Sequence, residues 1–397
     1  MITDCVRTFI EFVSQTRVRS ARANNGTAAK RKKTDVTASA DVLPAARVRG
    51  SLIGGAIGDA LGAPVSHLSL TEIRRILGPR GIAGYAYDGR GRITADMQMA
   101  MFTAEGLLCA WVRGQSSNRH EVLRSIHQAY VRWTLTQDEQ ANLADERVLA
   151  DGWLFRVPSM HGRRQRCCSL CLSAVMNATQ FAVAPVIDDG KEGGGGLFAR
   201  VVPVGLFARA FGDDEVVFDL AVEVAGLMTG HQASRLAAGY FAVVMAALVR
   251  GDALPAVLDT TSVLLERREG GEKISDAVAG ARSMAARPDL CPEDLEMLGA
   301  GGGTTAVLAV GICCALAART FSGGVLLATN HSGPSASTAA VTGNILGAIW
   351  GYDVIPPDWI MSLGLRHEIT RLADDLDGAA LNALDPAVLY DPYVGEQ

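Results

Sequence analysis

Two short polar turns carry the residue types that could bind a small ligand. Thr94–Asp96 precedes a long apolar segment at 97–111, and Gly333–Ser337 precedes another at 339–351. If each segment is a helix, its first turn presents free backbone N–H groups and the positive end of the helix dipole. Such turns bind anionic or polar groups, so we expect the two turns to face each other across one cleft.

Acidic side chains in this cleft would determine whether it binds a divalent cation. Magnesium requires a nearly octahedral set of oxygen ligands, so a site for such an ion needs several carboxylates. The first turn offers Asp96, whereas Gly333–Ser337 contains no acidic residue. One carboxylate cannot hold two dications, although it can hold one loosely through water.

A helix that is apolar on nearly all sides must position the second turn. Residues 339–351 combine apolar side chains with Gly343 and Gly347, which lie one helical turn apart, and such a helix belongs in the middle of a domain. A second helix, predicted over 47–62, has a glycine at every fourth position from 54 to 62. Each glycine costs about 1 kcal/mol relative to alanine, so we expect close helix packing along this face to compensate.

The chain as a whole predicts an all-α fold. No segment shows the convincing alternation of apolar and polar residues that is typical of a half-buried strand. We expect a compact orthogonal multi-helix bundle, with one domain over residues 46–397.

Residues 1–45 differ from this domain in composition. The apolar residues of 1–14 have helical spacing and predict a short amphipathic helix. Residues 17–40 are rich in Ala, Asn, Thr and basic side chains without aromatics, and they predict a disordered linker. We favour a solvated extension over a tethered helix that docks on a partner or across the cleft.

Composition excludes several classes of protein. The chain has 397 residues, 49% of them hydrophobic and 20% charged, with a net charge of −5, which permits a large core and gives no reason to expect nucleic acid as a partner. Its eight cysteines are scattered, and Cys167, Cys168 and Cys171 lack a matching pair at zinc spacing. The apolar runs at 236–249 and 305–318 are too short to span a bilayer. We expect buried helices there, no membrane, a cytoplasmic location and a monomer.

Several motifs occur in an order that resembles the ADP-ribosylglycohydrolase family, which includes the dinitrogenase reductase-activating glycohydrolase. The strongest covers 330–351, NHSGPSASTAAVTGNILGAIWG, and is similar to the family pattern NHxGDSDSTGAIxGNILGAxxG. The others are VRGSLIGGAIGDALGAPV at 48–65, ITADMQMAMFTAEGLLC at 93–109, GGGLFARVVPVGL at 194–206 and LMTGHQASRLAAG at 227–239. Together they span roughly residues 46–380.

The resemblance implies a reaction and a cofactor. Members of the family hydrolyse the bond between ADP-ribose and a protein side chain, or a related ADP-ribosyl bond, with two divalent cations, usually magnesium or manganese. The implied partners are ADP-ribose or an ADP-ribosylated protein. The implied ligand-binding residues are Asp59, Thr94, Asp96, His231, Asn330, His331, Gly333, Ser335 and Ser337. For Asp59, a buried hydrogen-bonding role is favoured over contact with a ligand.

The acidic ligands of the family pattern are mostly replaced in this chain. Thr94, Asp96 and Ser337 are the remnant of the metal site, and Asp96 is its one candidate catalytic residue. The family's other aspartates are replaced by Ala95, Pro334 and Ala336, its glutamate by Ser66, and the first histidine of its THGH segment by Thr229.

Three functions remain open from the sequence. The first, which we favour, is a catalytically impaired pseudoenzyme that retains an ADP-ribose-type cleft. The second is an active metal-dependent hydrolase that recruits substitute ligands such as Asp88, Glu105 or Asp188. The third is a regulatory or partner-binding protein on the same fold.

Overall fold

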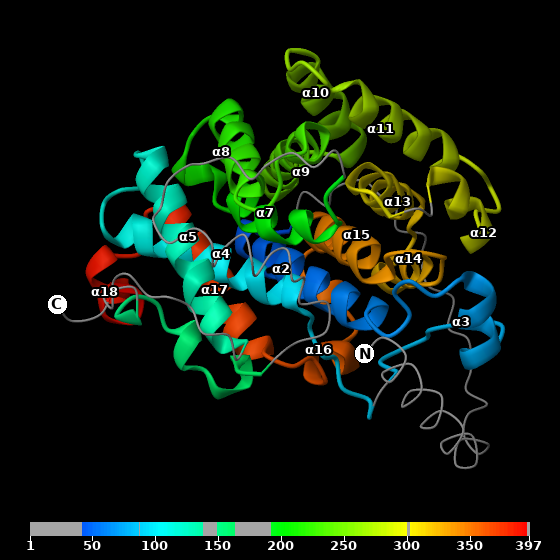
Figure 1. The fold of residues 1–397 in the computed structure, drawn as a ribbon, viewed down its shortest axis with the longest axis horizontal. Helices are drawn as coiled ribbons and strands as arrows, with labels where there is room; N and C mark the ends of the chain where they lie inside the picture. The colour runs from blue at the N-terminus through cyan, green and yellow to red at the C-terminus, as the bar shows by residue number, and fades with distance from the viewer. Residues whose placement is uncertain (1–41, 87, 138–148, 163–191, 300–301, 395–397) are drawn as a thin grey trace.

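Helices form the regular structure of this protein (Figure 1). The structure is a computed structural model, and it describes residues 42–86, 88–137, 149–162, 192–299 and 302–394. Within these ranges the one β pairing is an isolated bridge between Gly91 and Leu363. The prediction of an all-α bundle is therefore confirmed.

The α-helices follow one another along the whole described chain. They are α2 (Pro44–Gly62), α3 (Leu70–Leu77), α4 (Ala95–Val112), α5 (Arg119–Thr136), α7 (Gly196–Leu206), α8 (Asp214–Gly226), α9 (Gln232–Arg250), α10 (Leu254–Glu266), α11 (Glu272–Ala285), α12 (Pro292–Leu295), α13 (Thr304–Ala317), α14 (Phe321–Thr329), α15 (Ser335–Trp350), α16 (Pro357–Met361), α17 (Arg366–Ala380) and α18 (Pro386–Val394). Short 3-10 turns join some of them, among them Leu154–Arg156 and Tyr352–Val354.

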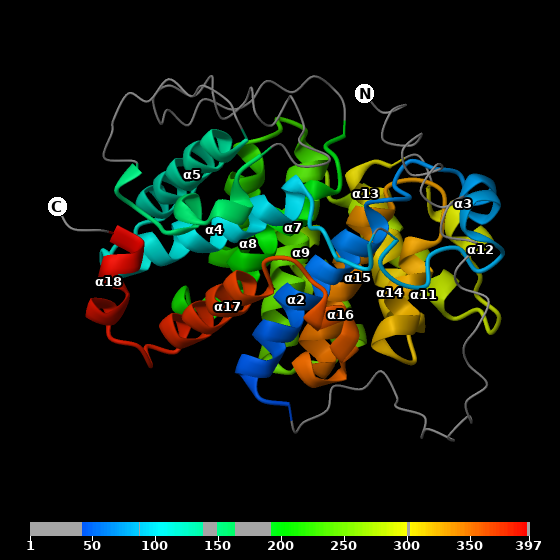
Figure 2. The same ribbon diagram turned by 90° about the horizontal axis from the view of Figure 1, so that it is seen from below.

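Helices α2 and α15 lie side by side at the centre of the molecule (Figures 1 and 2). Their glycines allow the two backbones to touch, as the sequence predicted. A Cβ atom added at Gly54 would lie 2.3 Å from the carbonyl oxygen of Gly343, and one added at Gly50 would lie 2.4 Å from that of Gly347. No side chain fits at these distances, so the contact compensates for the low helix propensity of glycine.

Arg47 in the first turn of α2 and Ser66 just after α2 form hydrogen bonds with backbone groups at the two ends of α15. The guanidinium of Arg47 donates to the carbonyl oxygens of Ala348 and Ile349 at 2.9 and 2.8 Å, which places a positive charge at the C-terminus of α15. At the other end, Ser66 Oγ accepts a hydrogen bond from the Ala336 N–H at 2.9 Å. The antiparallel pair is therefore fixed at both ends.

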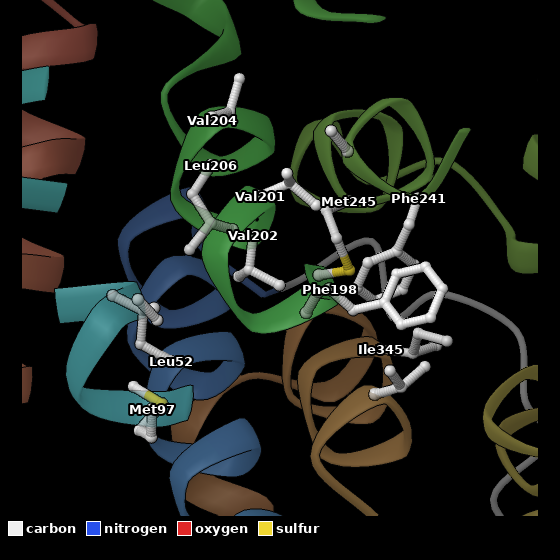
Figure 3. Close-up of a cluster of buried hydrophobic side chains, with 14 of the residues drawn as sticks. Leu52, Met97, Phe198, Val201, Val202, Val204, Leu206, Phe241, Met245 and Ile345 are labelled. Carbon is white, nitrogen blue, oxygen red and sulfur yellow. The ribbon is translucent and has the colours of Figure 1, made fainter. Parts of the chain in front are cut away.

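Helix α7 fills the space between this central pair and α9. Figure 3 shows Val201 and Phe198 of α7 beside Met245 and Phe241 of α9, and Val202 on the side of α7 that faces the central pair. Phe198 packs edge to face against Phe241 of α9, with ring centroids 5.1 Å apart. The residues of α7 are almost all buried, so its N-terminus is held rigidly against the helices that carry the two polar turns.

Helix α9 corrects one expectation from the sequence. The apolar run at 236–249 extends to a helix of 19 residues with a mean hydropathy of 1.4, so within the described residues it is long and apolar enough to cross a membrane. However, 83% of the apolar 18-residue stretch of this helix is buried inside the fold, as expected for a core helix.

The predicted helix starts shift by a few residues. Ala95 and Asp96 already belong to α4, and Ser335–Ser337 form the first turn of α15. Helix α2 begins at Pro44, where proline is favoured in the first turn. The expectations for residues 1–40, Cys167, Cys168 and Cys171 lie outside the described residues. The domain boundary at 46 stays a prediction.

Candidate functional site

The first polar turn is held by Asp59 of α2. Both carboxylate oxygens of Asp59 accept hydrogen bonds from Thr94, one from its N–H at 2.6 Å and one from its hydroxyl at 2.7 Å. Thr94 in turn caps α4, because its Oγ1 accepts from the Asp96 N–H at 3.2 Å. Asp59 is 2% exposed, so it orients the turn from inside the core.

The second turn is fixed by its own backbone and by Ser66. Gly333 has a φ of +114°, which favours glycine at this position, and its carbonyl oxygen accepts from the His67 N–H at 2.7 Å. The Ser66 hydroxyl accepts the hydrogen bond from the Ala336 N–H, as described for α15. Pro334, which precedes the helix, makes no side-chain cap. The turn therefore depends on α2 and the residues after it for its shape.

Both turns border one cavity of about 10 Å³. Its polar lining residues include Asp59, Asp96, Ser337 and Asn344. The remaining walls come mainly from α2, α4, α7 and α15. A volume of this size holds about one water molecule.

The start of α7 closes this cavity on one side. A Cβ atom added at Gly196 would lie 2.2 Å from Asp96 Oδ1, and one added at Gly195 would lie 2.5 Å from Ser337 Cβ. One turn further along α7, Arg200 Nη2 lies 3.4 Å from Asp96 Oδ1. The carboxylate of Asp96 therefore faces both the positive end of α7 and a buried guanidinium.

Glu192 and Gly193 attach the segment before α7 to two other helix starts. The Gly193 N–H donates to Ser234 Oγ of α9 at 2.9 Å, and the Gly193 carbonyl oxygen accepts from Thr304 Oγ1 of α13 at 2.5 Å. The carboxylate of Glu192 accepts from Thr305 Oγ1 at 3.1 Å. Because Thr305 lies in the first turn of α13, the negative charge of Glu192 is favourable there.

His231 caps α9 at the edge of this network. Its Nδ1 lies 3.0 Å from Ser234 Oγ and accepts from the Ser234 N–H at 3.3 Å. Ser234 Oγ is the same atom that accepts from Gly193. The structure thus brings His231 near the start of α7 rather than among the residues that line the cavity.

Asn330 and His331 make internal hydrogen bonds just before the second turn. Asn330 Oδ1 accepts from the Ile82 N–H at 2.7 Å, and its Nδ2 donates to the Ile82 carbonyl oxygen at 2.9 Å. His331 Nε2 lies 2.7 Å from Thr338 Oγ1, and its Nδ1 donates to the Ser332 carbonyl oxygen at 2.7 Å. Burial lowers the pKa of His331. Ser335 is also buried, with its hydroxyl 3.2 Å from the His331 carbonyl oxygen.

Comparison with known proteins identifies the family. The family model described as ADP-ribosylglycohydrolase matches residues 40–384. The chain belongs to the ADP-ribosylglycohydrolase family. A solved structure described as an ADP-ribosylglycohydrolase-related protein complex aligns with a TM-score of 0.59 and 21% identity, over 85% of this chain and 99% of that chain, which supports the same fold.

One curated relative is similar over a short segment. The chain is 41% identical over 56 residues to the ADP-ribosylarginine hydrolase Tri1 of Serratia proteamaculans (strain 568). The matched segment is 14% of this chain and covers 15% of that protein's length.

The described residues do not fit the divalent-cation site on which members of this family generally depend. No group of three or more His, Cys, Asp or Glu residues within the described ranges has the geometry of a metal site. Ala95 and Ala336, where the family pattern has aspartate, are 2% and 1% exposed. Of the two carboxylates at the cavity, Asp59 is bonded to Thr94 and Asp96 faces Arg200.

The substitute ligands suggested by the sequence lie elsewhere or are engaged. Glu105 is fully buried, and its carboxylate accepts from Arg132 Nη2 at 2.8 Å and from the N–H groups of Trp153 and Leu154 at 2.8 Å. Asp88 forms an exposed ion pair with Arg92 at 3.1 Å. Asp188 lies outside the described residues.

Sequence reasoning missed Arg200 and Glu192. Arg200 belongs to the motif RVVPVGL at 200–206, whose match to the family was noted without a role for the arginine. The signal that could have identified it is a lone basic residue in an apolar helix, which must find a negative partner when buried. Glu192 lies in a glycine-rich segment that carries no such signal.

Proposed function

We propose that this member of the ADP-ribosylglycohydrolase family is catalytically impaired and retains an ADP-ribose-type cleft. The proposal rests on the observation that both carboxylates at the cavity already have partners within the protein. Asp59 is bonded to Thr94 through both oxygens, and Asp96 faces Arg200. Paired dications need carboxylate charge to offset their mutual repulsion.

The replaced positions support the same proposal. Buried alanines at 95 and 336 supply methyl groups where metal ligands would be needed, and the Ser66 hydroxyl caps the second turn instead of reaching a reacting atom. Pro334 has no N–H and a fixed φ, so the second turn also loses a backbone donor. Hydrolysis that depends on two metals is therefore expected to be weak or absent.

The size of the cavity bears on ligand binding. The described cavity of about 10 Å³ has room for about one water molecule, so ADP-ribose does not fit inside it as it stands. Binding of ADP-ribose at this place would require the start of α7 to move away from Asp96 and Ser337. We therefore expect ADP-ribose to bind weakly, although the protein retains an ADP-ribose-type cleft.

The test is release of ADP-ribose from arginine- and serine-modified peptides with magnesium or manganese, beside an active family member. We expect no turnover close to that of the active member. Turnover within about tenfold, a barrier difference of only about 1.4 kcal/mol, would contradict the proposal and favour a hydrolase with substitute ligands.

Calorimetric titration with ADP-ribose, with and without magnesium, separates the remaining functions. Binding that is independent of magnesium would favour the impaired protein that retains the cleft, and binding that requires magnesium would favour the active hydrolase. Absence of binding would favour a regulatory or partner-binding protein on the same fold.

A further inference from the structure

Glu192 supplies the cap that helix α13 does not obtain from its own sequence. Gly303, which precedes the helix, has no side chain to accept from the free N–H groups of the first turn. The carboxylate of Glu192 provides this cap, because its two oxygens accept from Thr305 Oγ1 at 3.3 and 3.1 Å, and Oε2 lies 3.5 Å from the Thr305 nitrogen. A Cβ atom added at Gly303 would lie 2.1 Å from Glu192 Oε2, so only glycine leaves room for the carboxylate.

The residue after Glu192 is attached at the same place through its backbone. The N–H of Gly193 donates to Ser234 Oγ, and its carbonyl oxygen accepts from Thr304 Oγ1. Both of these side chains are 0% exposed, so they belong to the fixed core. We call Glu192 and Gly193, with their contacts to Ser234, Thr304 and Thr305, the Glu192 clasp. It joins the segment before α7 to the starts of α9 and α13.

The Glu192 clasp holds the part of the chain that closes the cavity. Gly195 and Gly196, which cover the cavity on one side, follow directly along the chain. They belong to the motif at 194–206 that resembles the family pattern, whereas Glu192 and Thr305 lie outside every motif quoted for that resemblance. The resemblance therefore covers the segment that closes the cavity and does not cover the contact that holds it.

We propose that Glu192 is a positioning residue whose clasp restrains the start of α7 and thereby restricts the access of an ADP-ribosyl ligand to the cleft. This inference rests on the proposed function, which retains an ADP-ribose-type cleft. The cavity beneath Gly195 and Gly196 has room for about one water molecule, so a ligand enters only when this segment moves. That movement breaks the contacts of Glu192 and leaves the first turn of α13 uncapped, so the clasp lowers the population of the open state.

Variants at the two ends of the clasp test whether the contact is the cause. Glu192→Ala removes the carboxylate, whereas Glu192→Gln keeps an acceptor for Thr305 without the charge. We expect the open state to be about fivefold to thirtyfold more populated in Glu192→Ala, with a smaller increase in Glu192→Gln. Thr305→Val removes the hydroxyl partner. Combined with Glu192→Ala it should add little, because both changes remove the same contact.

Hydrogen–deuterium exchange of the full chain, followed by mass spectrometry, measures this opening. The amides of Gly193, Leu197 and Phe198 each donate a hydrogen bond, so their exchange reports release of the segment. Exchange there should be faster in Glu192→Ala by the factor given for the open state. Glu272→Gln is the matched control, because α11 also follows a glycine without a side-chain cap and has Glu272 in its first turn. It should leave the exchange of this segment unchanged.

Calorimetric titration with ADP-ribose distinguishes restricted access from a merely structural role. Glu192→Ala should bind ADP-ribose at least about fivefold more tightly than the unmodified protein does, whereas Glu272→Gln should not. A carboxylate that only stabilised α13 would change the unfolding temperature without changing this affinity.

Three outcomes would overturn the proposal in distinguishable ways. If exchange is no faster in Glu192→Ala, the clasp does not hold the segment, and the impaired-enzyme proposal stands. If exchange is faster but the affinity for ADP-ribose is unchanged, the clasp does not control access, and the cleft stands. If no variant binds ADP-ribose, the retained cleft is wrong as well, and both proposals fail. Should Glu192→Ala not fold, the same two measurements on Glu192→Gln and Thr305→Val decide the question.

Discussion

Glu105 shows how a side chain that looks suited to chemistry can be committed to the core. Its carboxylate bonds to the Arg132 guanidinium and to two backbone N–H groups, and both side chains of the ion pair are at most 1% exposed. Removing one partner of such a pair leaves a buried charge uncompensated. We expect Glu105→Gln to reduce the free energy of unfolding by about 3–5 kcal/mol, measured by urea unfolding followed by circular dichroism.

Asp88→Asn is the matched control for Glu105→Gln. It also removes the carboxylate of an acid–arginine ion pair, that of Asp88 with Arg92, but the two side chains of this pair are 43% and 65% exposed. Exposed pairs contribute at most about 1 kcal/mol, so this variant should unfold almost as the unmodified protein does. Similar losses for the two variants would show that the burial of Glu105 is not the cause.

Restoring the acidic residues tests the remnant site directly. The quadruple variant Ser66→Glu, Ala95→Asp, Pro334→Asp, Ala336→Asp should be less stable than the unmodified protein without metal, by about 3 kcal/mol or more, because it buries unpaired carboxylates. Added manganese should then raise its unfolding temperature, since an ion that binds the folded state stabilises it.

The double variant Ala95→Asp with Ala336→Asp separates charge from turn geometry. It leaves Pro334 in place, which fixes φ and lacks an N–H. We expect a smaller response to manganese than in the quadruple variant. Differential scanning calorimetry with and without manganese measures the unfolding temperatures of the two variants. A quadruple variant that manganese does not stabilise would show that these four positions are not sufficient to form a metal site.

His331 gives the fold a dependence on pH. Burial lowers the pKa of its imidazole below the ordinary value of 6.5, so the unfolded chain takes up a proton at higher pH than the folded chain does. Stability is therefore fully present above about pH 6.5 and is lost as pH falls toward the folded pKa, with a slope of at most about 1.4 kcal/mol per pH unit. Burial lowers the pKa of His127 in the same direction.

His331→Asn isolates the contribution of this one group. Urea unfolding at a series of pH values between about 7.5 and 5.5 should show a shallower loss of stability for His331→Asn than for the unmodified protein. The His127 contribution stays in both proteins and cancels in the comparison. Identical pH dependences would contradict the assignment of a buried neutral imidazole at 331.

At the scale of elements, the contact between α2 and α15 allows no added atom. The Cβ of Gly54→Ala would stand 2.3 Å from the Gly343 carbonyl oxygen, so the two helices would have to separate. We expect a loss of stability of at least about 2 kcal/mol, measured by urea unfolding.

Gly280→Ala in α11 is the control for Gly54→Ala. Gly280 also lies inside a helix, but an added Cβ would meet only Leu298 Cδ2 at 3.6 Å, an ordinary contact. This variant should gain up to about 1 kcal/mol from helix propensity. Opposite signs at the two glycines are the expected result, and a stabilising Gly54→Ala would refute the close contact.

The central elements were predictable from the sequence, whereas the closure of the cavity was not. Glycines at fixed helical spacing predict close helix packing because few other arrangements compensate for them. The position of Gly195 and Gly196 depends on contacts with Ser234 and Thr304, which are about 40 and 110 residues away along the chain. The pattern of neighbouring residues does not indicate such distant contacts.

The residues of the two turns show the same limit. Thr94 has a residue type that favours the position before a helix, and it caps α4 in the structure. The pairing of Asp96 with Arg200 joins residues 104 positions apart. Asn330 looks like a ligand residue in the motif, yet its amide serves the backbone of Ile82, which no spacing within the motif could indicate.

At the scale of the whole molecule, the exposed large apolar side chains of the described part come from several elements. The large hydrophobic residues that are exposed in the described part include Leu43, Val263, Met297 and Val388, which lie on separate elements. A stable dimer would need a contiguous apolar patch. We therefore expect light scattering to give a mass near that of one chain, 41.8 kDa, and a concentration-independent mass twice that value would contradict this.

The contact between α2 and α15 also sets the order in which a newly made chain can fold. The hydrogen bond from Asn344 to Ser51 joins residues 293 positions apart, so α2 leaves the ribosome long before its partner exists. At synthesis rates of about 5–20 residues per second, it waits for roughly 15 to 60 s. During that interval its glycine-lined, apolar surface is available to chaperones or to other nascent chains, and a chain released before residue 335 would never acquire a native centre.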